Sequence, residues 1–458
     1  MLAPNIPRSA LPGTAWPSLL DNAGATKLAV LQQLEASQWM TPEQLQVQQA
    51  QQLQLLIQHA NTTVPWFRGK LESKKLFPNG QLDMDAWRAI PILTRNILQK
   101  NFEQLQSQQL PPQHGEIQVT TTSGSTGTPV KVACSALHNF FWYVMTLREH
   151  QWHQRDFSLP LTSIRYFNPG RADYPDGGEQ DKWGAPVSDI YKTGPSHILS
   201  IHASVHEQLE WLKTRDVGYL LSYPSNIAEL ARLCKQRDVS MKNIQHVRTV
   251  SEIVDQKLRD LCMDAWGAKI IDTYSIKEAG YVALQCPEHE HYHTQDETLF
   301  VEILDEQGNA CQPGQIGRVI VTVLHNFAMP LIRYDLNDYA EVGEPCPCGR
   351  GLGTIKRILG RVRNMMILPD GSRKWPLYDH EALAKVVPLR RVQFVQTDRE
   401  DITVNLEMDG EFTSNHEREL TGIIRKNFGY PFKLTFRLHD EIARDVGGKF
   451  EDFKSELL

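Results

Sequence analysis

Apolar positions in the middle of this 458-residue chain alternate between short strand-like runs and helix-like spacing. The run VGYLLSYPS precedes NIAELARLCKQ, HVRTVSE precedes IVDQKLRDLCMDAWG, and KIIDTYS follows. Short apolar runs are typical of buried strands, whereas apolar residues three or four positions apart indicate one face of a helix. A strand, a helix and another strand in succession predict an α/β fold.

Two further elements can be predicted before this region. The segment from Thr41 to Ala60, TPEQLQVQQAQQLQLLIQHA, opens with a helix-start signal and repeats leucine at helical spacing. Its glutamine bias could indicate disorder, but the leucine pattern favours a packed helix. Farther on, β-branched residues alternate from Ile117 to Thr121 and again at Val130 and Val132, which predicts a hairpin.

The C-terminal part of the chain has a different pattern. From Leu299 it becomes strand-rich, with LFVEILDEQG, GRVIVTVL and YAEVGE, and from VRNMMILPDG onward it reads as a small α+β unit. A chain of this length exceeds what one hydrophobic core usually holds. We therefore expect a large N-terminal domain, residues 1–360, with β-sheets flanked by helices, and a small α+β domain, residues 361–458.

Composition narrows the function classes. A formal net charge of −6 provides no basic field for nucleic acid or an anionic membrane, so we expect a small-molecule partner. The chain has no apolar run of about eighteen residues, and its start lacks the apolar core of a signal peptide, which predicts a cytoplasmic protein. Seven scattered cysteines do not resemble a secreted disulfide framework, which favours thiol or metal chemistry.

The tip of the predicted hairpin is the first candidate binding site. In VTTTSGSTGTPVKV, from Val119 to Val132, glycines allow backbone conformations in which successive N–H groups converge, and hydroxyls add donors. Such a tip suits an anion, although the Gly-Lys-Ser/Thr ending of the other common phosphate loop is absent. A flexible surface turn is the alternative interpretation.

Metal chemistry is a second, separate signal. The segments QCPEHEHYH (285–293) and EPCPCGRG (344–351) combine cysteine and histidine, the ligand types that zinc prefers. Two cysteines one residue apart are followed by a glycine that a tight knuckle would use. The alternative is a turn with buried thiols.

Five motifs together point to a family. TTSGSTGTPVKV, TYSIKEAG, PLIRYDLNDYA, ILGRVRNMMILPDG and GGKF occur in the order and spacing of the adenylate-forming acyl-CoA ligase superfamily. The chain resembles the phenylacetate-CoA ligase branch, and HANTTVPWFRGKL and IPILTRNILQKNF extend the resemblance over nearly its whole length. Five motifs in register favour the phosphate-loop interpretation of the hairpin tip.

The resemblance implies that ATP and a carboxylate react to give acyl-AMP and pyrophosphate, which requires charge neutralisation and alignment of two anions. It implies that Tyr274 packs against adenine, Ser275 faces the α-phosphate, and Glu278 holds Mg2+. The ribose carboxylate falls on Asp338 and not on Asp335. The remaining nucleotide-binding positions that it implies are Ser123, Gly124, Ser125, Thr126, Gly127, Thr128, Ser251, Glu252 and Arg361. For YSIKEAG alone, a strand end before a helix with a solvated glutamate is the alternative.

The family's catalytic lysine falls on Lys449. Two preceding glycines let a loop approach a ligand, and the ammonium would bridge the attacking carboxylate and the α-phosphate. A solvated surface lysine is the alternative. In relatives the C-terminal domain is a mobile lid that swings between an adenylating and a thiol-transferring pose. The hinge matches Arg363, where many members have aspartate or lysine.

Similar cysteine and histidine positions bind a structural zinc in parts of this branch. The resemblance therefore implies Cys286, His293, Cys346 and Cys348 as ligands, with His291 or His289 as a substitute for the histidine. Four protein ligands close the coordination shell, so this zinc would be structural.

These residues predict an ATP- and Mg2+-dependent ligase that activates an aryl or acyl carboxylate as acyl-AMP and transfers it to coenzyme A. Glu451 and Asp452 stand where many relatives have basic residues, and their charge would repel the coenzyme's phosphates. Val130 precedes Lys131, so the lysine of the phosphate loop stands one position away from its place in the commoner family pattern. The alternatives are transfer to an amine or a carrier-protein thiol, adenylylation of a phenolic deazaflavin, and a non-catalytic zinc-stabilised binding protein.

Two expectations stay open at this level. A homodimer or a carrier protein could be a partner. The aromatic residues Phe140, Phe141, Trp142 and Tyr143 follow the loop on a predicted helix and could line an acyl pocket, although an aromatic helix is more often part of the core.

Overall fold

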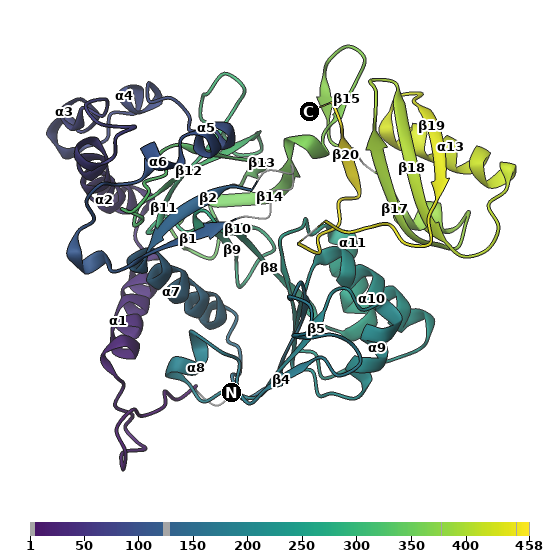
Figure 1. Ribbon diagram of the computed structural model, residues 1–458, viewed down its shortest axis with the longest axis horizontal. Helices are drawn as coiled ribbons and strands as arrows, with labels where there is room; N and C mark the ends of the chain where they lie inside the picture. The colour runs from purple at the N-terminus through teal and green to yellow at the C-terminus, as the bar shows by residue number, and fades with distance from the viewer. Residues whose placement is uncertain (1–4, 122–128, 377, 446, 458) are drawn as a thin grey trace. The chain divides into compact units, whose positions relative to one another are not determined.

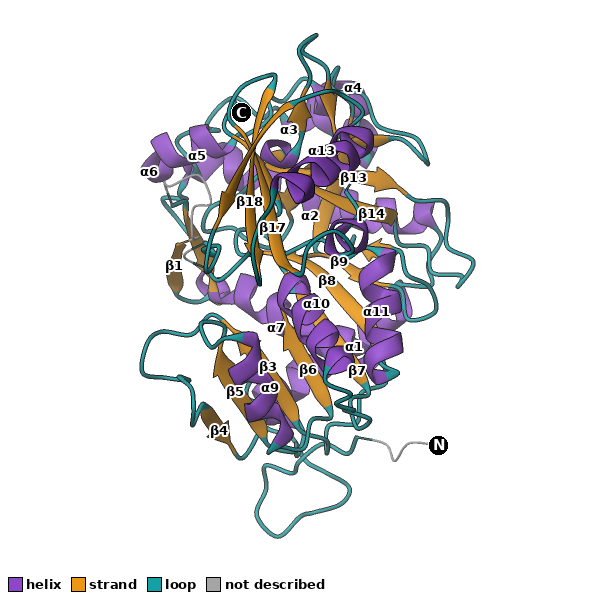
Figure 2. Ribbon diagram, turned by 90° about the vertical axis from the view of Figure 1, so that its right-hand side faces the viewer, coloured by secondary structure: helices purple, strands orange, loops and turns teal. Residues whose placement is uncertain are grey.

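The computed structural model describes residues 5–121, 129–376, 378–445 and 447–457. The chain forms two compact units, Met1–Ile358 and Leu359–Leu458 (Figure 1). The first unit begins with helices, alternates strands and helices through its middle and ends in strands, and the second unit combines a small sheet with helices (Figure 2). The predicted α/β class with a small α+β C-terminal part is confirmed.

The helices of the first unit follow from local signals that the sequence carries. They are α1 (Asn22–Ser37), α2 (Pro42–Thr63), α3 (Ser73–Leu76), α4 (Met84–Arg88), α5 (Arg95–Lys100), α6 (Phe102–Leu105), α7 (Ala136–Trp152), α8 (Val187–Ile190), α9 (Val205–Lys213), α10 (Pro224–Gln236) and α11 (Gln256–Trp266), with 3-10 turns at Pro78–Gly80 and Pro112–His114. The predicted glutamine-rich helix is α2, where Thr41 and Gln44 form a capping box and Leu53, Leu56 and Ile57 are buried.

One twelve-stranded sheet organises this unit. Its strands are β3 (Leu161–Arg165), β4 (Gly178–Gln180), β5 (Ser196–Ser200), β6 (Tyr219–Ser222), β7 (His246–Val250), β8 (Lys269–Ile276), β9 (Gly280–Gln285), β10 (Tyr292–Thr294), β11 (Leu299–Leu304), β12 (Ile316–Val323), β13 (Tyr334–Val342) and β14 (Thr354–Arg361). Their order is β11-β12-β13-β14-β10-β9-β8-β7-β6-β3-β5-β4. The run β5-β3-β6-β7-β8 is parallel, and antiparallel pairing begins between β8 and β9.

Helices cover both faces of the parallel run. On one face α9, α10 and α11 lie side by side and bury Leu209, Leu230 and Cys262 against strand residues such as Val247 (Figure 1). A separate apolar cluster joins α1 and α7 to Tyr219. The predicted alternation of strands and helices from β6 to β8 is therefore confirmed, and burial of these apolar faces stabilises it.

The predicted hairpin is also confirmed. Strands β1 (Ile117–Thr121) and β2 (Lys131–Ser135) pair antiparallel, with Thr121 opposite Lys131. The predicted phosphate-binding residues, Ser123 to Thr128, lie outside the described residues.

The second unit has its own core. Its elements are a 3-10 turn at Val362–Asn364, helices α12 (His380–Ala384) and α13 (Ser414–Phe428), and strands β15 (Met366–Ile367), β16 (Arg373–Lys374), β17 (Leu389–Gln396), β18 (Asp401–Met408), β19 (Lys433–Leu438) and β20 (Phe453–Ser455). The order β19-β18-β17-β20 forms the sheet, on which α13 packs through Ile424 and Phe428 against Phe394 and Phe453. Among the described helices of either unit, none has the length and apolar character needed to cross a membrane.

Candidate nucleotide site and metal centre

Two predicted nucleotide-binding residues from separate motifs are in direct contact. The Tyr274 hydroxyl on β8 donates a hydrogen bond to Asp338 Oδ2 on β13, at 2.7 Å. Asp335, the neighbouring candidate, instead accepts from Arg318 Nη1 at 3.1 Å and from a backbone N–H two residues on. Burial raises the pKa of Asp335. The two carboxylates of this motif therefore have different partners, and Asp338 is the one beside Tyr274.

A β-bulge shapes the backbone at this point. The register between β8 and β9 shifts between Tyr274 and Ser275, so that Ser275 pairs with Tyr281. Gly280, at the start of β9, has a φ of +90°, which favours glycine. Bulges redirect side chains and are frequent beside functional sites. The turn between the two strands carries Glu278.

Glu278 is buried and lies beside a cation that the sequence analysis did not single out. Arg95, the first residue of α5, places Nη1 at 3.6 Å from Glu278 Oε1. Burial, followed by the negative charge of Glu278, raises the pKa of the nearby Cys134 thiol to about 11. A buried carboxylate oxygen of this kind suits Mg2+. In the sequence, Arg95 lies in IPILTRNILQKNF, a segment that carried the resemblance without a role for this residue, directly after Thr94, the N-cap of α5.

Ser251 and Glu252, the predicted nucleotide-binding residues directly after β7, differ in their structural features. Ser251 has a φ of +75°, a backbone conformation that non-glycine residues rarely adopt and that is common at functional sites. Glu252 Oε2 accepts a hydrogen bond from the Ser225 backbone N–H at 2.8 Å, in the first turn of α10. Glu252 therefore caps the start of α10. Ser251 is distinguished instead by its unusual backbone conformation.

In the second unit, the loop before Lys449 is closed by one carboxylate. Asp445 Oδ1 accepts hydrogen bonds from the backbone N–H groups of Gly447, at 2.9 Å, and Lys449, at 2.8 Å. Gly448 has a φ of +78°, so this turn requires glycine. Lys449 is half-buried. Arg361, at the end of β14, donates its backbone N–H to Asn364 Oδ1 at 3.2 Å.

Two residues that depart from the family pattern neutralise each other. Arg363, at the predicted hinge position, forms an ion pair with Glu451. Asp452 accepts a hydrogen bond from the Tyr378 hydroxyl at 2.8 Å. The expectation that Glu451 repels an anionic acceptor is weakened by this pairing, because the Arg363 charge compensates its carboxylate.

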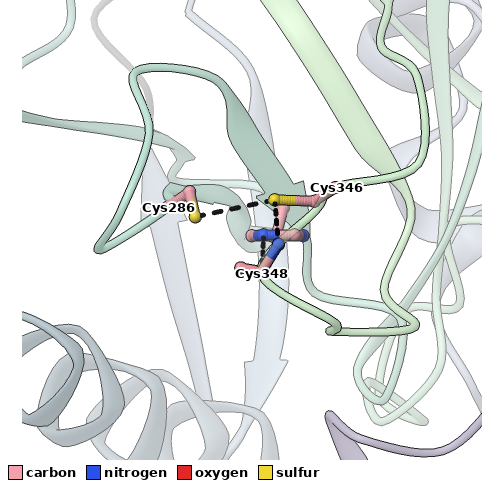
Figure 3. A group of neighbouring side chains, drawn as sticks. Cys286, Cys346 and Cys348 are labelled. Atoms are coloured by element: carbon pink, nitrogen blue, oxygen red, sulfur yellow. Dashed lines mark hydrogen bonds between the residues drawn. The ribbon is translucent and has the colours of Figure 1, made fainter.

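The two cysteine and histidine segments meet in space. Cys286, directly after β9, His293 on β10, and Cys346 and Cys348 place one ligand atom each within 4.8 Å of one another. Figure 3 shows the three cysteines of this group. His289 and His291 are not members of this group. All seven cysteines of the chain are free.

Two of the ligand-to-ligand distances in this cluster match a tetrahedral zinc site. Zinc bonds of about 2.3 Å to sulfur and about 2.0 Å to nitrogen predict an S···S edge of about 3.8 Å and an S···N edge of about 3.5 Å. Cys286 Sγ and Cys346 Sγ are 3.8 Å apart, and Cys348 Sγ is 3.4 Å from His293 Nε2. Burial lowers the pKa of His293 to about 3, so its imidazole is neutral and able to bind a metal.

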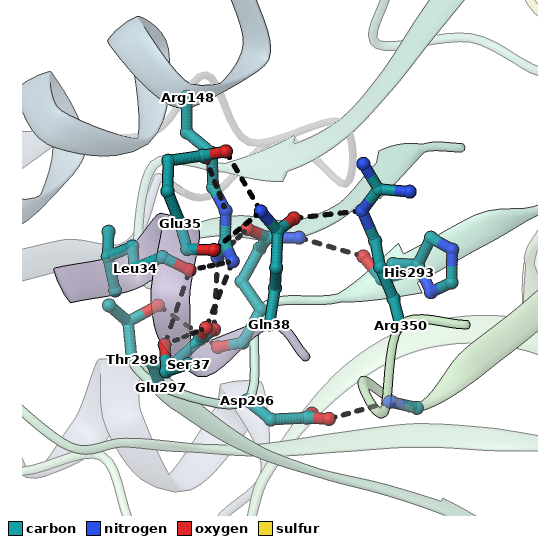
Figure 4. Close-up of polar contacts among 12 residues, drawn as sticks. Leu34, Glu35, Ser37, Gln38, Arg148, His293, Asp296, Glu297, Thr298 and Arg350 are labelled. Carbon is teal, nitrogen blue, oxygen red and sulfur yellow. Dashed lines mark hydrogen bonds and ion pairs between the residues drawn. The ribbon is translucent and has the colours of Figure 1, made fainter. Parts of the chain in front are cut away.

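The knuckle that carries Cys346 and Cys348 is held against the junction of α1 and α2. Arg350 Nε donates to Gln38 Oε1 at 2.8 Å (Figure 4). The Gly351 N–H donates to the Gln38 carbonyl oxygen at 2.9 Å. The Arg350 guanidinium also lies over the Trp39 ring, 4.6 Å from its centroid. A Cβ on Gly351 would come within 1.8 Å of the Met40 carbonyl oxygen. These contacts therefore join the knuckle to the segment between α1 and α2.

Comparison with known proteins agrees with this architecture. Residues 381–456 match the family described as the CapK C-terminal domain. The phenylacetate-coenzyme A ligase of Pseudomonas putida is 21% identical over 390 residues, which covers 82% of this chain and 85% of that protein. Among solved structures, 2-hydroxyisobutyryl-CoA ligase in its postadenylation state gives a TM-score of 0.67 at 16% identity over 89% of each chain.

The same ligase, in complex with its adenylate and coenzyme A, gives a TM-score of 0.57 at 17% identity and covers 92% of each chain. These matches confirm the predicted resemblance to the phenylacetate-CoA ligase branch of adenylate-forming enzymes. The solved structures, at this identity, confirm the fold.

Proposed function

We propose that this chain is an AMP-forming ligase that activates a carboxylate with ATP and transfers the acyl group to coenzyme A. The hydrogen bond between Tyr274 and Asp338 is the observation that carries the proposal, because it joins two motifs 64 residues apart beside the Glu278 turn. The similarity to phenylacetate-CoA ligases along most of the chain supports the same reaction class.

In this proposal the residues divide the work of nucleotide binding. The hairpin tip, Ser123 to Thr128, binds the β- and γ-phosphates. Tyr274 packs against adenine and Asp338 binds the ribose, while Ser275 faces the α-phosphate. Arg361 contacts the ribose or the phosphates, and Ser251 borders the nucleotide through its strained backbone.

The first half-reaction forms a bond between the carboxylate oxygen and the α-phosphorus and breaks the bond to pyrophosphate. Mg2+, when bound at Glu278, neutralises phosphate charge. Arg95 holds the Glu278 carboxylate in place until then. Lys449 bridges the two reacting anions, and Asp445 keeps its loop closed. In this proposal residues 361–458 act as a mobile lid with a hinge at Arg363.

Coenzyme A is the proposed acceptor. The solved ligase with the same fold binds an adenylate and coenzyme A, and the Arg363 ion pair compensates Glu451 in this chain. Transfer to an amine or a carrier-protein thiol stays the alternative, because Asp452, which accepts a hydrogen bond from the Tyr378 hydroxyl, adds a second carboxylate beside Glu451.

A structural zinc in the Cys286, His293, Cys346 and Cys348 cluster completes the proposal. His293 presents Nε2 to the cluster, 3.4 Å from Cys348 Sγ, and its ring also has a hydrogen bond with the Leu352 backbone, the kind of second contact that orients a metal-binding histidine. With four protein ligands the site has no open position for substrate.

Pyrophosphate exchange tests the function directly. The protein, incubated with ATP, labelled pyrophosphate and a panel of aryl and aliphatic carboxylates, should incorporate label into ATP only when a substrate acid is present. The Glu278→Gln variant should lose this exchange. Exchange that is independent of any acid, or absent with all of them, would contradict the proposal.

A further inference from the structure

The loop that carries Lys449 joins the two edges of the C-terminal sheet. In the order β19-β18-β17-β20, strands β19 and β20 are the edges (Figure 1), and residues 439–452 connect them. On this path the loop meets Glu407, near the end of β18, and Arg391, near the beginning of β17. A connection of this length has many conformations unless side chains fix it. The contacts of Glu407 and Arg391 therefore bear on where Lys449 is held.

Arg391 and Glu407 form a buried ion pair that holds one residue of this loop. They are cross-strand partners, each side chain is 9% exposed, and Arg391 Nη1 lies 3.4 Å from Glu407 Oε2. Arg391 Nη1 also donates to the Ile442 carbonyl oxygen at 3.1 Å, and the Ile442 N–H donates to Glu407 Oε2 at 3.1 Å. One ion pair therefore binds both polar groups of the Ile442 backbone.

The same guanidinium contacts the loop a second time, immediately after Lys449. Arg391 Cζ lies 5.2 Å from the centroid of the Phe450 ring, which is a cation–π distance. A planar guanidinium can donate to a carbonyl oxygen and stack on an aromatic ring, whereas a lysine ammonium is a point charge without such a face. Ile442 precedes Lys449 and Phe450 follows it, so Arg391 contacts the loop on both sides of Lys449.

Between these two points the loop is hydrogen-bonded to itself. The Asp445 N–H donates to the Lys449 carbonyl oxygen at 2.8 Å, and the Lys449 N–H donates to Asp445 Oδ1 at 2.8 Å. Arg444 Nη1 donates to the Gly448 carbonyl oxygen at 3.4 Å. The backbone around Lys449 is thus a small bonded unit, and its attachment at Arg391 determines where it lies.

The ion pair is better suited to fixing this loop than to adding stability. Two charges removed from water gain little over apolar residues of similar volume, because the desolvation penalty offsets their attraction. Apolar residues in their place would leave the buried Ile442 N–H and carbonyl oxygen without these partners, which is unfavourable. The directional contacts of the pair are therefore its distinguishing contribution.

We propose that Arg391, paired with Glu407, is a positioning residue for adenylation and holds the loop in the conformation that presents the Lys449 ammonium. The proposal rests on the proposed ligase function, in which Lys449 bridges the two reacting anions. Arg391 acts through Lys449 and does not itself contact the substrates. Its removal should therefore slow adenylation and leave the KM for ATP nearly unchanged.

Pyrophosphate exchange with variants of Arg391 tests this role. Arg391→Met should lower kcat by about tenfold to a hundredfold and change the KM for ATP less than about threefold, since a small displacement of a reacting group slows a step strongly. Arg391→Lys keeps the charge opposite Glu407 but not the planar face, so it should fold and retain only part of the rate.

Arg425→Met is the matched control. Arg425 Nε, on α13, donates to the Phe432 carbonyl oxygen at 2.8 Å and so holds a different loop of the same unit. This variant should keep the kcat of the unchanged protein. An unchanged kcat in Arg391→Met, or equal losses in Arg391→Met and Arg425→Met, would overturn the proposal.

A double variant shows whether Arg391 acts through Lys449. Lys449→Ala already lacks the ammonium, so the addition of Arg391→Met should slow pyrophosphate exchange less than about twofold further. A further loss of about tenfold would give Arg391 an independent role and contradict the proposal. If Arg391→Met does not fold, Phe450→Leu replaces it, because this change keeps the buried ion pair. Phe450→Leu should lower kcat and Phe450→Tyr, which keeps a ring, should retain it; equal rates in these two variants would also contradict the proposal.

Amide hydrogen exchange separates this proposal from the ligase function. In the whole chain without ATP or acid, the bonded amides of Gly447, Gly448 and Lys449 should exchange about tenfold faster in Arg391→Met but not in Arg425→Met. Unchanged exchange of these amides in Arg391→Met would overturn the proposal and leave an active ligase standing. If no acid supports pyrophosphate exchange, the ligase function fails, and the amides alone decide whether Arg391 holds the loop.

Discussion

The guanidinium of Arg363 forms an ion pair with the carboxylate of Glu451 inside the C-terminal unit. Each residue on its own departs from the family pattern, one at the hinge position and one after the catalytic lysine. Together they form a compensated pair, with side chains 17% and 25% exposed. Two departures that looked independent along the sequence are therefore one structural feature.

This pair should behave as a unit in a double-mutant cycle. Arg363→Glu places two negative charges side by side, and Glu451→Arg places two positive charges side by side, so each should destabilise the C-terminal unit. The double variant restores a pair of opposite charges. We expect a coupling free energy of about 1 kcal/mol, because the pair is only partly buried. Thermal unfolding of the four proteins measures it. Additive effects of the two single changes would show that the contact contributes nothing.

The Tyr274 and Asp338 hydrogen bond predicts a loss of nucleotide affinity when the carboxylate is removed. Asp338→Asn should weaken ATP binding tenfold or more, since an amide is a poorer partner for ribose hydroxyls. Asp335→Asn is the matched control three residues away, and it should reduce stability through its lost partner Arg318 without the same effect on affinity. Calorimetric titration with ATP separates the two, and equal losses in both variants would remove Asp338 from the nucleotide site.

Local elements of this fold could be predicted from the sequence because their signals are local. The Thr41 cap and the leucine spacing define α2, and β-branched alternation defines the β1 and β2 hairpin. The order of strands in the large sheet could not be predicted, because β14 lies between β13 and β10 and no local pattern records that neighbour. Long-range pairing depends on the packing of the whole core.

The candidate site likewise contains residues that the sequence predicts and contacts that only the fold creates. Cys286, His293, Cys346 and Cys348 were predicted by ligand type and resemblance, and the structure brings those four together. The contact between Arg95 and Glu278 spans 183 positions and could not be predicted. The stacking of His325 on Phe141 could not be predicted for the same reason, because the two residues meet only through the fold.

The metal cluster predicts about one zinc per chain in protein purified without chelators. Cys346→Ser should lower the zinc content well below one and reduce thermal stability, because metal affinity here is also folding free energy. Cys311→Ser is the control, since Cys311 is a free cysteine outside the cluster. Elemental analysis and thermal unfolding measure both effects. Full zinc content in Cys346→Ser, or no zinc in the unchanged protein, would contradict the site.

Buried histidines predict that the protein loses stability in mild acid. Burial lowers the pKa of His138 and His325 from the usual 6.5 to about 4, so the unfolded chain takes up these protons first. Their contribution is complete above pH 6.5 and declines as the pH falls toward 4, by about 1.4 kcal/mol per pH unit for each histidine. Denaturant unfolding between pH 7 and 4 should show a shallower decline for His138→Phe, and an unchanged slope would mean that His138 titrates normally in the folded protein.

The last prediction separates the two half-reactions through Lys449. Its loop is closed by Asp445, and its ammonium is proposed to stabilise charge only while the carboxylate attacks ATP. Lys449→Ala should therefore slow adenylate formation by about a hundredfold or more, as the loss of one preorganised charge donor typically does. Transfer from presynthesised acyl-AMP should be nearly unaffected, because a lid that has turned no longer presents Lys449 to the reacting group.

Lys454→Ala on β20 is the control for a general change of charge in this unit. Assays with coenzyme A, with a simple amine and without acceptor identify the acceptor in the same experiment. Equal slowing of both half-reactions would contradict the two-pose mechanism, and normal adenylation would make Lys449 a surface residue.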